Sequence, residues 1–295
     1  MNKHWILIDC NYMCWRHYFQ MRKLSYENVP TGVMFGFMRD LNKLKELFGD
    51  RFVFCFDYGD NKRKKINPDY KASRATKREE MSEEEKEAYE ALIKQINSLR
   101  DEVLPEMGFR NIVFQSGYEA DDVIARICKQ INQPDIATII SGDHDLYQLI
   151  KNNVSVYHPI TQQRVSMDGF IQKYQIDPPT WRMVKAIAGC NSDDIKGVPK
   201  VGEKTAVKFL NRELKPTTKA YKAIMANRQL IYNNLPLVHL PLKGTKSIKL
   251  QEDTVNEHKW QKIMDLHGMR SLRNKPPKLK RKEFIDAKSE QGQFI

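Results

Sequence analysis

The 295-residue sequence has no apolar run of about 18 residues, the length that a membrane-spanning helix needs. Its five cysteines are odd in number and include no Cys-x-x-Cys pair, so neither a disulfide framework nor a zinc ribbon is indicated. No G-x-G-x-x-G follows the first apolar run and no P-loop occurs, which argues against dinucleotide and P-loop nucleotide sites. We therefore expect a cytoplasmic protein in a reducing compartment.

Acidic residues are also fewer than basic ones. The chain carries 49 Lys and Arg against 37 Asp and Glu, a formal net charge of +12. Such an excess predicts attraction to a polyanion, and nucleic acid is the commonest one. Charge alone does not separate DNA from RNA or from anionic lipid.

Four short, nearly continuous apolar runs are typical of strands that are covered on both faces of a parallel sheet. They are residues 5–8, 52–56, 112–114 and 136–140. Helical patterns lie between them, for example from Val33 to Leu47 and from Val123 to Ile131. This order predicts an α/β fold with a mostly parallel central sheet flanked by helices.

Acidic residues follow each of the four apolar runs. They are Asp9, Asp57, Glu119, and the pair Asp143 and Asp145, and they are joined by Asp121, Asp122 and, further on, Asp193. A single Asp after a strand is usually a turn former or a helix cap. Four at the ligand-binding edge of one sheet are too many for a general acid and base pair, and they lack a matching His or Cys set. We interpret them as ligands of Mg²⁺ or Mn²⁺, with two ions about 4 Å apart that activate water against a phosphodiester.

A long insert, residues 59–105, separates the second and third strands. Its first half is strongly basic, and its second half is helical, with a capping box at Ser82 and Glu85. The insert could be a solvated linker with a packing helix, or a basic segment that holds a phosphate backbone over the acidic edge. Its origin at that edge favours the second interpretation.

The segment Gly197-Val-Pro-Lys-Val-Gly202 lies between two helical patterns and predicts a helix-hairpin-helix, although a plain Gly/Pro turn fits it as well. We expect an α/β core over residues 1–175, a helix-hairpin-helix region over 176–242, and a C-terminal extension over 243–295. Residues 270–282 contain seven Lys and Arg, two prolines and no acid, which predicts a flexible basic tail.

The motifs GYEADDV, SGDHDLYQL, NPDYKASR and GVPKVGEKTAVKFL resemble the signatures of the 5′-nuclease superfamily. This superfamily includes flap endonucleases, the 5′-nuclease domain of bacterial DNA polymerase I and phage 5′–3′ exonucleases, and the resemblance runs from about Trp5 to about Leu240. It implies a PIN-like fold with a helical arch, and a monomer in the cytoplasm of a bacterium or of a phage-infected host.

The resemblance also assigns roles to individual residues. It implies metal ligands at Asp9, Asp57, Glu119, Asp121, Asp122, Asp143, Asp145 and Asp193. It implies that Lys71 and Arg74, which we expect on one face of an arch helix, contact the scissile phosphate, and it matches Arg63 to a basic arch residue. Gly197, Val198, Lys200, Gly202 and Lys204 would grip duplex DNA, with a potassium ion on the carbonyl groups of the hairpin.

The chain departs from the pattern of this superfamily at two positions. The usual G-D-x-x-D is Gly189-Cys190-Asn191-Ser192-Asp193, so that Cys190 replaces one expected ligand. Lys200 replaces the inner glycine of the hairpin. We expect Asp194 to compensate partly for the charge that is missing at Cys190.

The leading hypothesis is a metal-dependent, structure-selective 5′ nuclease that acts on DNA ends, flaps or branches, and on RNA in RNA–DNA hybrids. A branched-DNA-binding protein with little or no hydrolysis is the alternative, and a small PIN-type ribonuclease would leave the basic insert and the hairpin unexplained. The last residues, Gln291–Ile295, resemble a peptide that binds a sliding clamp, although a frayed terminus is the usual state of such residues.

Overall fold

The computed structural model describes residues 2–276. A six-stranded sheet runs through the molecule in the order β5-β4-β1-β6-β7-β8. Its strands are β1 (His4–Asp9), β4 (Arg51–Cys55), β5 (Ile112–Val113), β6 (Ile136–Ile140), β7 (Val154–His158) and β8 (Gln163–Val165). All neighbouring pairs are parallel except β7 with β8. The predicted, mostly parallel sheet is confirmed, and β7 and β8 are strands that the sequence analysis did not identify.

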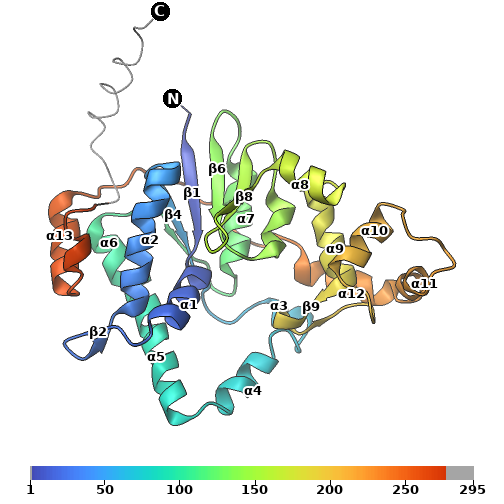
Figure 1. Cartoon of the computed structure of the whole chain (residues 1–295), viewed down its shortest axis with the longest axis horizontal. Helices are drawn as coiled ribbons and strands as arrows, with labels where there is room; N and C mark the ends of the chain where they lie inside the picture. The colour runs from blue at the N-terminus through green and yellow to red at the C-terminus, as the bar shows by residue number, and fades with distance from the viewer. Residues whose placement is uncertain (1, 277–295) are drawn as a thin grey trace, which may run out of the picture.

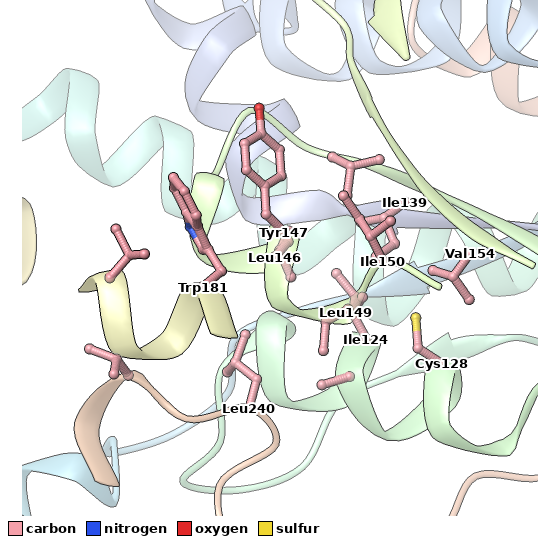
Figure 2. Packing of buried hydrophobic residues seen from close by; sticks show 14 of the residues in the cluster. Ile124, Cys128, Ile139, Leu146, Tyr147, Leu149, Ile150, Val154, Trp181 and Leu240 are labelled. Atoms are coloured by element: carbon pink, nitrogen blue, oxygen red, sulfur yellow. The ribbon is translucent and has the colours of Figure 1, made fainter. Parts of the chain in front are cut away.

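Alternate residues of the central strands enter two separate hydrophobic clusters, as the period of a strand requires. Ile6 and Phe54 face one cluster, while Leu7 and Val53 face the other. Helices α1 (Cys10–Met21), α2 (Gly32–Phe48) and α5 (Glu83–Ser98) supply the first cluster, and α7 (Ala120–Gln130) and α9 (Trp181–Ala188) supply the second. Figure 2 shows part of the second cluster, in which Trp181 packs beside Tyr147.

The remaining elements are short. Four strands outside the main sheet have two residues each: β2 (Ser25–Tyr26), β3 (Val29–Pro30), β9 (Gly189–Cys190) and β10 (Ile195–Lys196). The other α-helices are α3 (Arg63–Ile66), α4 (Ser73–Glu79), α6 (Leu104–Met107), α8 (Met167–Tyr174), α10 (Glu203–Leu210), α11 (Lys219–Ala226), α12 (Arg228–Val238) and α13 (Glu257–Leu266). A π-helical turn, η1 (Leu99–Val103), joins α5 to α6, and 3-10 turns form η2 (His144–Leu149), η3 (Pro178–Thr180), η4 (Asn191–Asp193) and η5 (Arg270–Leu272).

The insert spans α3 to α6, and in Figure 1 its helices α4 and α5 extend away from the body of the molecule as two arms of an arch. The predicted capping box is present, since Glu85 N–H donates to Ser82 Oγ and Ser82 N–H donates to the Glu85 carboxylate. The helical spacing expected of Lys71 and Arg74 is wrong. Lys71 precedes α4 in a left-handed conformation (φ 55°), and only Arg74 lies in the helix.

The second hydrophobic cluster continues from the sheet into α9, α10 and α12, and thus crosses the expected boundary between residues 175 and 176. The three-part division of the chain remains a prediction. From residue 243 onward the chain returns to the sheet, where Asn111 exchanges two hydrogen bonds with the backbone of Gln251. Trp260 on α13 is fully buried.

The expected flexible tail is wrong at its beginning. Leu272 is buried, and its carbonyl oxygen accepts a hydrogen bond of 2.8 Å from the indole of Trp260. The chain therefore packs against α13 beyond Arg270, because Leu272 within the basic stretch and Met269 directly before it supply apolar anchors. Residues 277–282 of that stretch, and Gln291–Ile295, for which clamp binding was predicted, lie outside the described residues.

Within residues 2–276, the longest apolar helices fall short of what is needed to cross a membrane.

Candidate active site

Parallel pairing brings the acidic residues that follow separate strands to one edge of the sheet. Because β1 pairs with both β4 and β6, Asp9 lies between the chain segments that carry Asp57 and Asp143. The backbone N–H of Ala120 donates to Asp57 Oδ1 at 2.7 Å, which fixes the start of α7, with Glu119 and Asp121, at the same edge. Five of the predicted ligands therefore lie at this edge, namely Asp9, Asp57, Glu119, Asp121 and Asp143. Figure 1 shows that the arch begins at the same edge.

Asp9 is the most deeply enclosed of these carboxylates. It caps α1 by accepting the Tyr12 N–H at 3.0 Å, and it accepts the Ser141 hydroxyl at 2.9 Å. Burial raises the pKa of Asp9 above its ordinary value, and Asp57 adds to the increase. The two hydrogen bonds act in the opposite direction and only partly offset it.

Asp121 experiences the same crowding. Burial raises its pKa well above the ordinary value, and the charges of Asp143 and Asp9 raise it further. Within the part of the chain that the structure describes, Asp9, Asp57, Asp121 and Asp143 make no ion pair shorter than 4.0 Å. No side-chain cation of the described residues therefore lies within 4.0 Å of these four carboxylates, and Lys71 and Arg74 act on the pKa of Asp57 only from a greater distance.

The neighbouring acids, by contrast, pair with side-chain cations. Lys71 Nζ contacts Glu119 and lies 3.5 Å from Asp193 Oδ1, and Arg74 donates to the same Asp193 oxygen at 2.8 Å. Although burial opposes it, Lys71 and Arg63 hold the pKa of Glu119 below its ordinary value. The arch residues expected to contact phosphate thus meet two of the expected metal ligands.

Arg63 and Asp122 form a buried ion pair. This pair contradicts the predicted role of Asp122 as a metal ligand and the predicted role of Arg63 as a basic arch residue that contacts DNA. Arg63 is 1% exposed and donates two hydrogen bonds to Asp122, at 2.6 and 2.8 Å, and a third to the Leu237 carbonyl oxygen. Asp122 is fully buried and also accepts the Leu242 N–H at 2.7 Å. Both Asp122 oxygens are occupied and Arg63 does not reach the surface, so Asp122 is no metal ligand and Arg63 no DNA contact in this arrangement.

The sequence analysis missed Tyr70 and Lys185. The buried Tyr70 hydroxyl donates to Glu119 at 2.9 Å and lies 3.3 Å from an Asp193 oxygen. Lys185 Nζ lies 2.8 Å from Asp145 and 3.0 Å from Glu203. Tyr70 lies within the quoted motif NPDYKASR, and Lys185 lies four residues after the buried Trp181 on the apolar face of α9, where a lysine is conspicuous.

The expected hairpin joins α9 to α10 but is longer than predicted, because β9, η4 and β10 lie between α9 and Gly197. Gly197 packs against the end of α9, where a Cβ would collide with the Ala188 carbonyl oxygen. The DNA contact predicted for Val198 is wrong, since the Val198 side chain is buried and its N–H donates to the Ile187 carbonyl oxygen at 2.8 Å. It therefore packs the hairpin and offers no group to DNA.

The other hairpin residues remain at the surface. Lys200 adopts the left-handed conformation (φ 62°) that glycine would take at its position, so the turn is formed despite the substitution. Gly202 precedes the first turn of α10 and has open space around it, and Lys204 follows in that turn. An exposed helix start with two lysines beside it suits a phosphate group.

The donor atoms fit divalent cations. Asp9, Asp57, Glu119, Asp121 and Asp143 offer only carboxylate oxygen, which hard ions such as Mg²⁺ and Mn²⁺ prefer. A second group, made by Asp145, Cys190 and Asp193, has one donor atom from each residue within 4.8 Å of the others. Divalent cations would neutralise the charge that these side chains accumulate.

Comparisons with known proteins identify the family to which the chain belongs. Residues 4–175 match the family model of the 5′-3′ exonuclease N-terminal resolvase-like domain. A 5′-3′ exonuclease of Mycoplasmopsis pulmonis is 32% identical over 213 residues, covering 71% of this chain and 67% of that protein. A thermostable DNA polymerase I of Thermus thermophilus is 32% identical over 211 residues, which are 70% of this chain but 23% of the polymerase.

Solved structures share the fold. A structure described as divalent metal ions (zinc) bound to T5 5′-exonuclease superposes with a TM-score of 0.69 at 22% identity, covering 92% of this chain and 99% of that one. The catalytic core of Rad2 in complex with DNA substrate gives a TM-score of 0.52 at 15% identity, covering 90% of this chain and 87% of that one. The family match, the relatives and the acidic edge lead to one conclusion: the chain belongs to the 5′-3′ exonuclease family and is a nuclease of the 5′-nuclease superfamily.

Proposed function

We propose that this protein is a divalent-metal-dependent, structure-selective 5′ nuclease that hydrolyses phosphodiesters near the 5′ ends and flaps of DNA, and of RNA in RNA–DNA hybrids. One observation carries the proposal: the carboxylates that end three strands converge where Lys71 and Arg74 enter from the arch. Carboxylates alone would repel a phosphodiester. Cationic side chains beside a divalent-metal site would hold it there.

Different residues of the chain would bind the phosphate, position the carboxylates and hold the cations. Lys71 and Arg74, which pair with Glu119 and Asp193, would turn toward the scissile phosphate when DNA is present and orient it. Tyr70 is buried against Glu119 and would keep that carboxylate in place while Lys71 moves. Asp9, Asp57 and Asp121 would hold divalent cations, which supply activation of the attacking water and neutralise charge on the leaving oxygen.

Mg²⁺ or Mn²⁺ are the cations we propose, two per site, because the carboxylate group around Asp9 offers oxygen ligands only. Support for a divalent ion also comes from the T5 5′-exonuclease structure, whose description includes bound zinc. Gly202, Lys200 and Lys204 would bind the backbone of the adjoining duplex, with a potassium ion on the hairpin carbonyl groups. We propose that the protein acts as a monomer in the cytoplasm of a bacterium or of a phage-infected host.

The test is cleavage of a 5′-labelled flap by the full chain with Mg²⁺, Mn²⁺, Ca²⁺ or a chelator. We expect cleavage near the flap junction with Mg²⁺ and Mn²⁺ and none with the chelator. A blunt duplex and a single strand measure structural selectivity, and an RNA flap tests the hybrid substrate. Tight binding of the flap without cleavage under any cation would instead identify a branched-DNA-binding protein.

A further inference from the structure

One cavity takes its walls both from the chain beside the acidic edge and from the helix-hairpin-helix. Its volume is about 510 Å³, within the range of small-ligand sites, and it is lined by η2, the end of α8, the start of α9 and α10. Figure 1 shows α8, α9 and α10 at the same end of the molecule. His144, which stands between Asp143 and Asp145 in the chain, belongs to the wall, and neither of these acids does. The cavity therefore adjoins the carboxylate site without being part of it.

The wall of this cavity contains an indole N–H that has no acceptor. Trp181 lines the cavity and is fully buried, and its Nε1 makes no hydrogen bond within residues 2–276. The buried indole of Trp260, by comparison, donates to the Leu272 carbonyl oxygen at 2.8 Å. Because buried donors are almost always paired, the Trp181 N–H indicates an acceptor that the fold itself does not supply.

An aromatic ring borders this N–H. Tyr174 is half-buried, lines the same cavity and lies 4.7 Å from the Trp181 ring, centroid to centroid. Since Trp181 has no exposed surface, a ligand would reach its N–H as the Tyr174 ring turns aside and offers its face to a flat group. Such rings stack on nucleobases, whose carbonyl oxygens and ring nitrogens are acceptors for an indole N–H.

Three exposed lysines line the same cavity: Lys173, Lys204 and Lys208. In the part of the chain that the structure describes, none of the three makes an ion pair within 4.0 Å. Of the two acids in the wall, Glu203 is already paired with Lys185 at 3.0 Å, which leaves Glu213. The cavity therefore combines an aromatic wall with unpaired positive charge, which attracts phosphate.

Two side-chain contacts fix the walls relative to one another. Asn211 Nδ2 donates to the Tyr174 carbonyl oxygen at 3.0 Å and ties the chain after α10 to the end of α8. Lys185 on α9 donates to Glu203 in the first turn of α10 at 3.0 Å. The cavity is thus formed before any ligand binds.

We propose that this cavity binds an unpaired nucleotide of a nucleic-acid strand, with its base against Tyr174 and the Trp181 N–H and its phosphate against the lysines. A nucleotide combines the flat ring, the hydrogen-bond acceptor and the negative charge that these three features select. The cavity shares α10 with the surface on which Lys204 would hold duplex backbone, so the nucleotide would follow the end of that duplex. The inference rests on the proposed function, because it names a contact for the unpaired part of the same substrate.

The experiment follows the indole N–H of Trp181 by nuclear magnetic resonance. The full chain is labelled with nitrogen-15 tryptophan, the Trp181 signal is assigned from Trp181→Phe, and Ca²⁺ replaces Mg²⁺. We expect a single-stranded tetranucleotide to move the Trp181 proton signal downfield, because the N–H gains an acceptor. The Trp260 signal should stay in place, since that N–H is already hydrogen-bonded. A blunt duplex should leave both signals in place.

A double variant tests the lysines. Lys173→Gln with Lys208→Gln should raise the tetranucleotide concentration that gives half of the shift by at least about 5-fold, the effect of two lost exposed ion pairs. Lys219→Gln with Lys222→Gln, two exposed lysines outside the cavity wall, is the matched control and should leave it unchanged. Circular dichroism checks that all variants are folded.

The inference is overturned if the tetranucleotide leaves the Trp181 signal in place, if the blunt duplex moves it equally, or if both double variants behave alike. The measurement involves no cleavage. A shift of the Trp181 signal in a chain that cleaves no substrate would therefore support the nucleotide site while the proposed function fails. Flap cleavage without the shift would give the reverse result.

Discussion

Glu119 and Asp121 are two residues apart at the start of α7, yet the charges around them are opposite in sign. Glu119 contacts Lys71 and Arg63 and accepts the Tyr70 hydroxyl, and its pKa is lowered. Asp121 faces other carboxylates, and its pKa is raised. The comparison shows that added cations are needed beside Asp121 and the other carboxylates without an ion pair, which are Asp9, Asp57 and Asp143, and less so beside Glu119.

The difference arises from the insert. Every cation that pairs with Glu119 comes from residues 59–105, and the ion pairs of these side chains are made with Glu119, Asp122 and Asp193. Asp9 and Asp121 make no ion pair within 4.0 Å with the cations of the insert. We infer that the insert leaves one side of the edge for divalent ions and positions its own cations on the other side, where a phosphate would bridge the two.

The largest expected effect is on cleavage when a carboxylate of the unpaired side is neutralised. Asp121→Asn or Asp143→Asn should lower single-turnover cleavage by about 100-fold or more, because a lost ligand removes transition-state stabilisation. DNA affinity, measured with Ca²⁺ by fluorescence anisotropy, should remain within about 3-fold. Asp168→Asn on α8 is the matched control, and full activity of either variant would remove that residue from the metal site.

Arg63→Ala tests the buried ion pair between Arg63 and Asp122. Removing Arg63 leaves the Asp122 carboxylate buried without its partner, so the free energy of unfolding should fall by about 3 to 5 kcal/mol. Urea denaturation measures this change. Arg74→Ala, whose side chain is 46% exposed, should cost no more than about 1 kcal/mol. Unchanged stability with weaker DNA binding would restore Arg63 to the DNA-contacting residues.

Lys71→Ala should separate turnover from affinity. A charge that orients the scissile phosphate acts mainly in the transition state, so we expect turnover to fall by about 10- to 100-fold and the Kd for the flap to change by less than about 3-fold. Rapid-quench cleavage and anisotropy provide the two numbers. The opposite split, with unchanged turnover and weaker binding, would make Lys71 a phosphate anchor only.

The smallest effect concerns the stability of the metal-free protein against pH. Because the folded state raises the pKa of Asp121 and Asp9, the native protein binds more protons than the unfolded chain above the ordinary value of 3.8, and up to about 7 for Asp9. Stability should therefore fall as pH rises through that window. In Asp121→Asn this loss should shrink, with a Tm at pH 7 that is higher than wild type by about 2 °C or more.

Glu119→Gln should behave in the opposite way. The lowered pKa of Glu119 stabilises the fold above the unfolded value and this contribution is lost as pH falls through the folded value, so the variant should be less stable than wild type near pH 7. Differential scanning calorimetry with a chelator measures both variants. Equal shifts of the same sign would show that the two acids share one electrostatic environment.

Much of the site was readable from the sequence because it depends on local order along the chain. Each apolar run predicted a strand, and the acid after it predicted a position at the carboxyl edge, which placed Asp9, Asp57 and Asp143 correctly at that edge. The capping box at Ser82 was equally predictable, since its two partners are three residues apart. The strand that carries Val156 was missed, because Ser155 interrupts its apolar residues and it is not one of the continuous apolar runs from which the other strands were predicted.

What the sequence determined by itself is four strands of the sheet, the carboxylates that follow them and the basic insert, since these follow from neighbouring residues and from the rule that parallel strands end at one edge. Only the tertiary structure decided which charges meet. Arg63 and Asp122 are 59 positions apart and Lys71 and Asp193 are 122 apart, and no local pattern distinguishes a buried partner from a DNA contact or a metal ligand. That choice depends on which side chains the packed core excludes from water, because a buried charge must find a partner inside the fold whereas an exposed one need not.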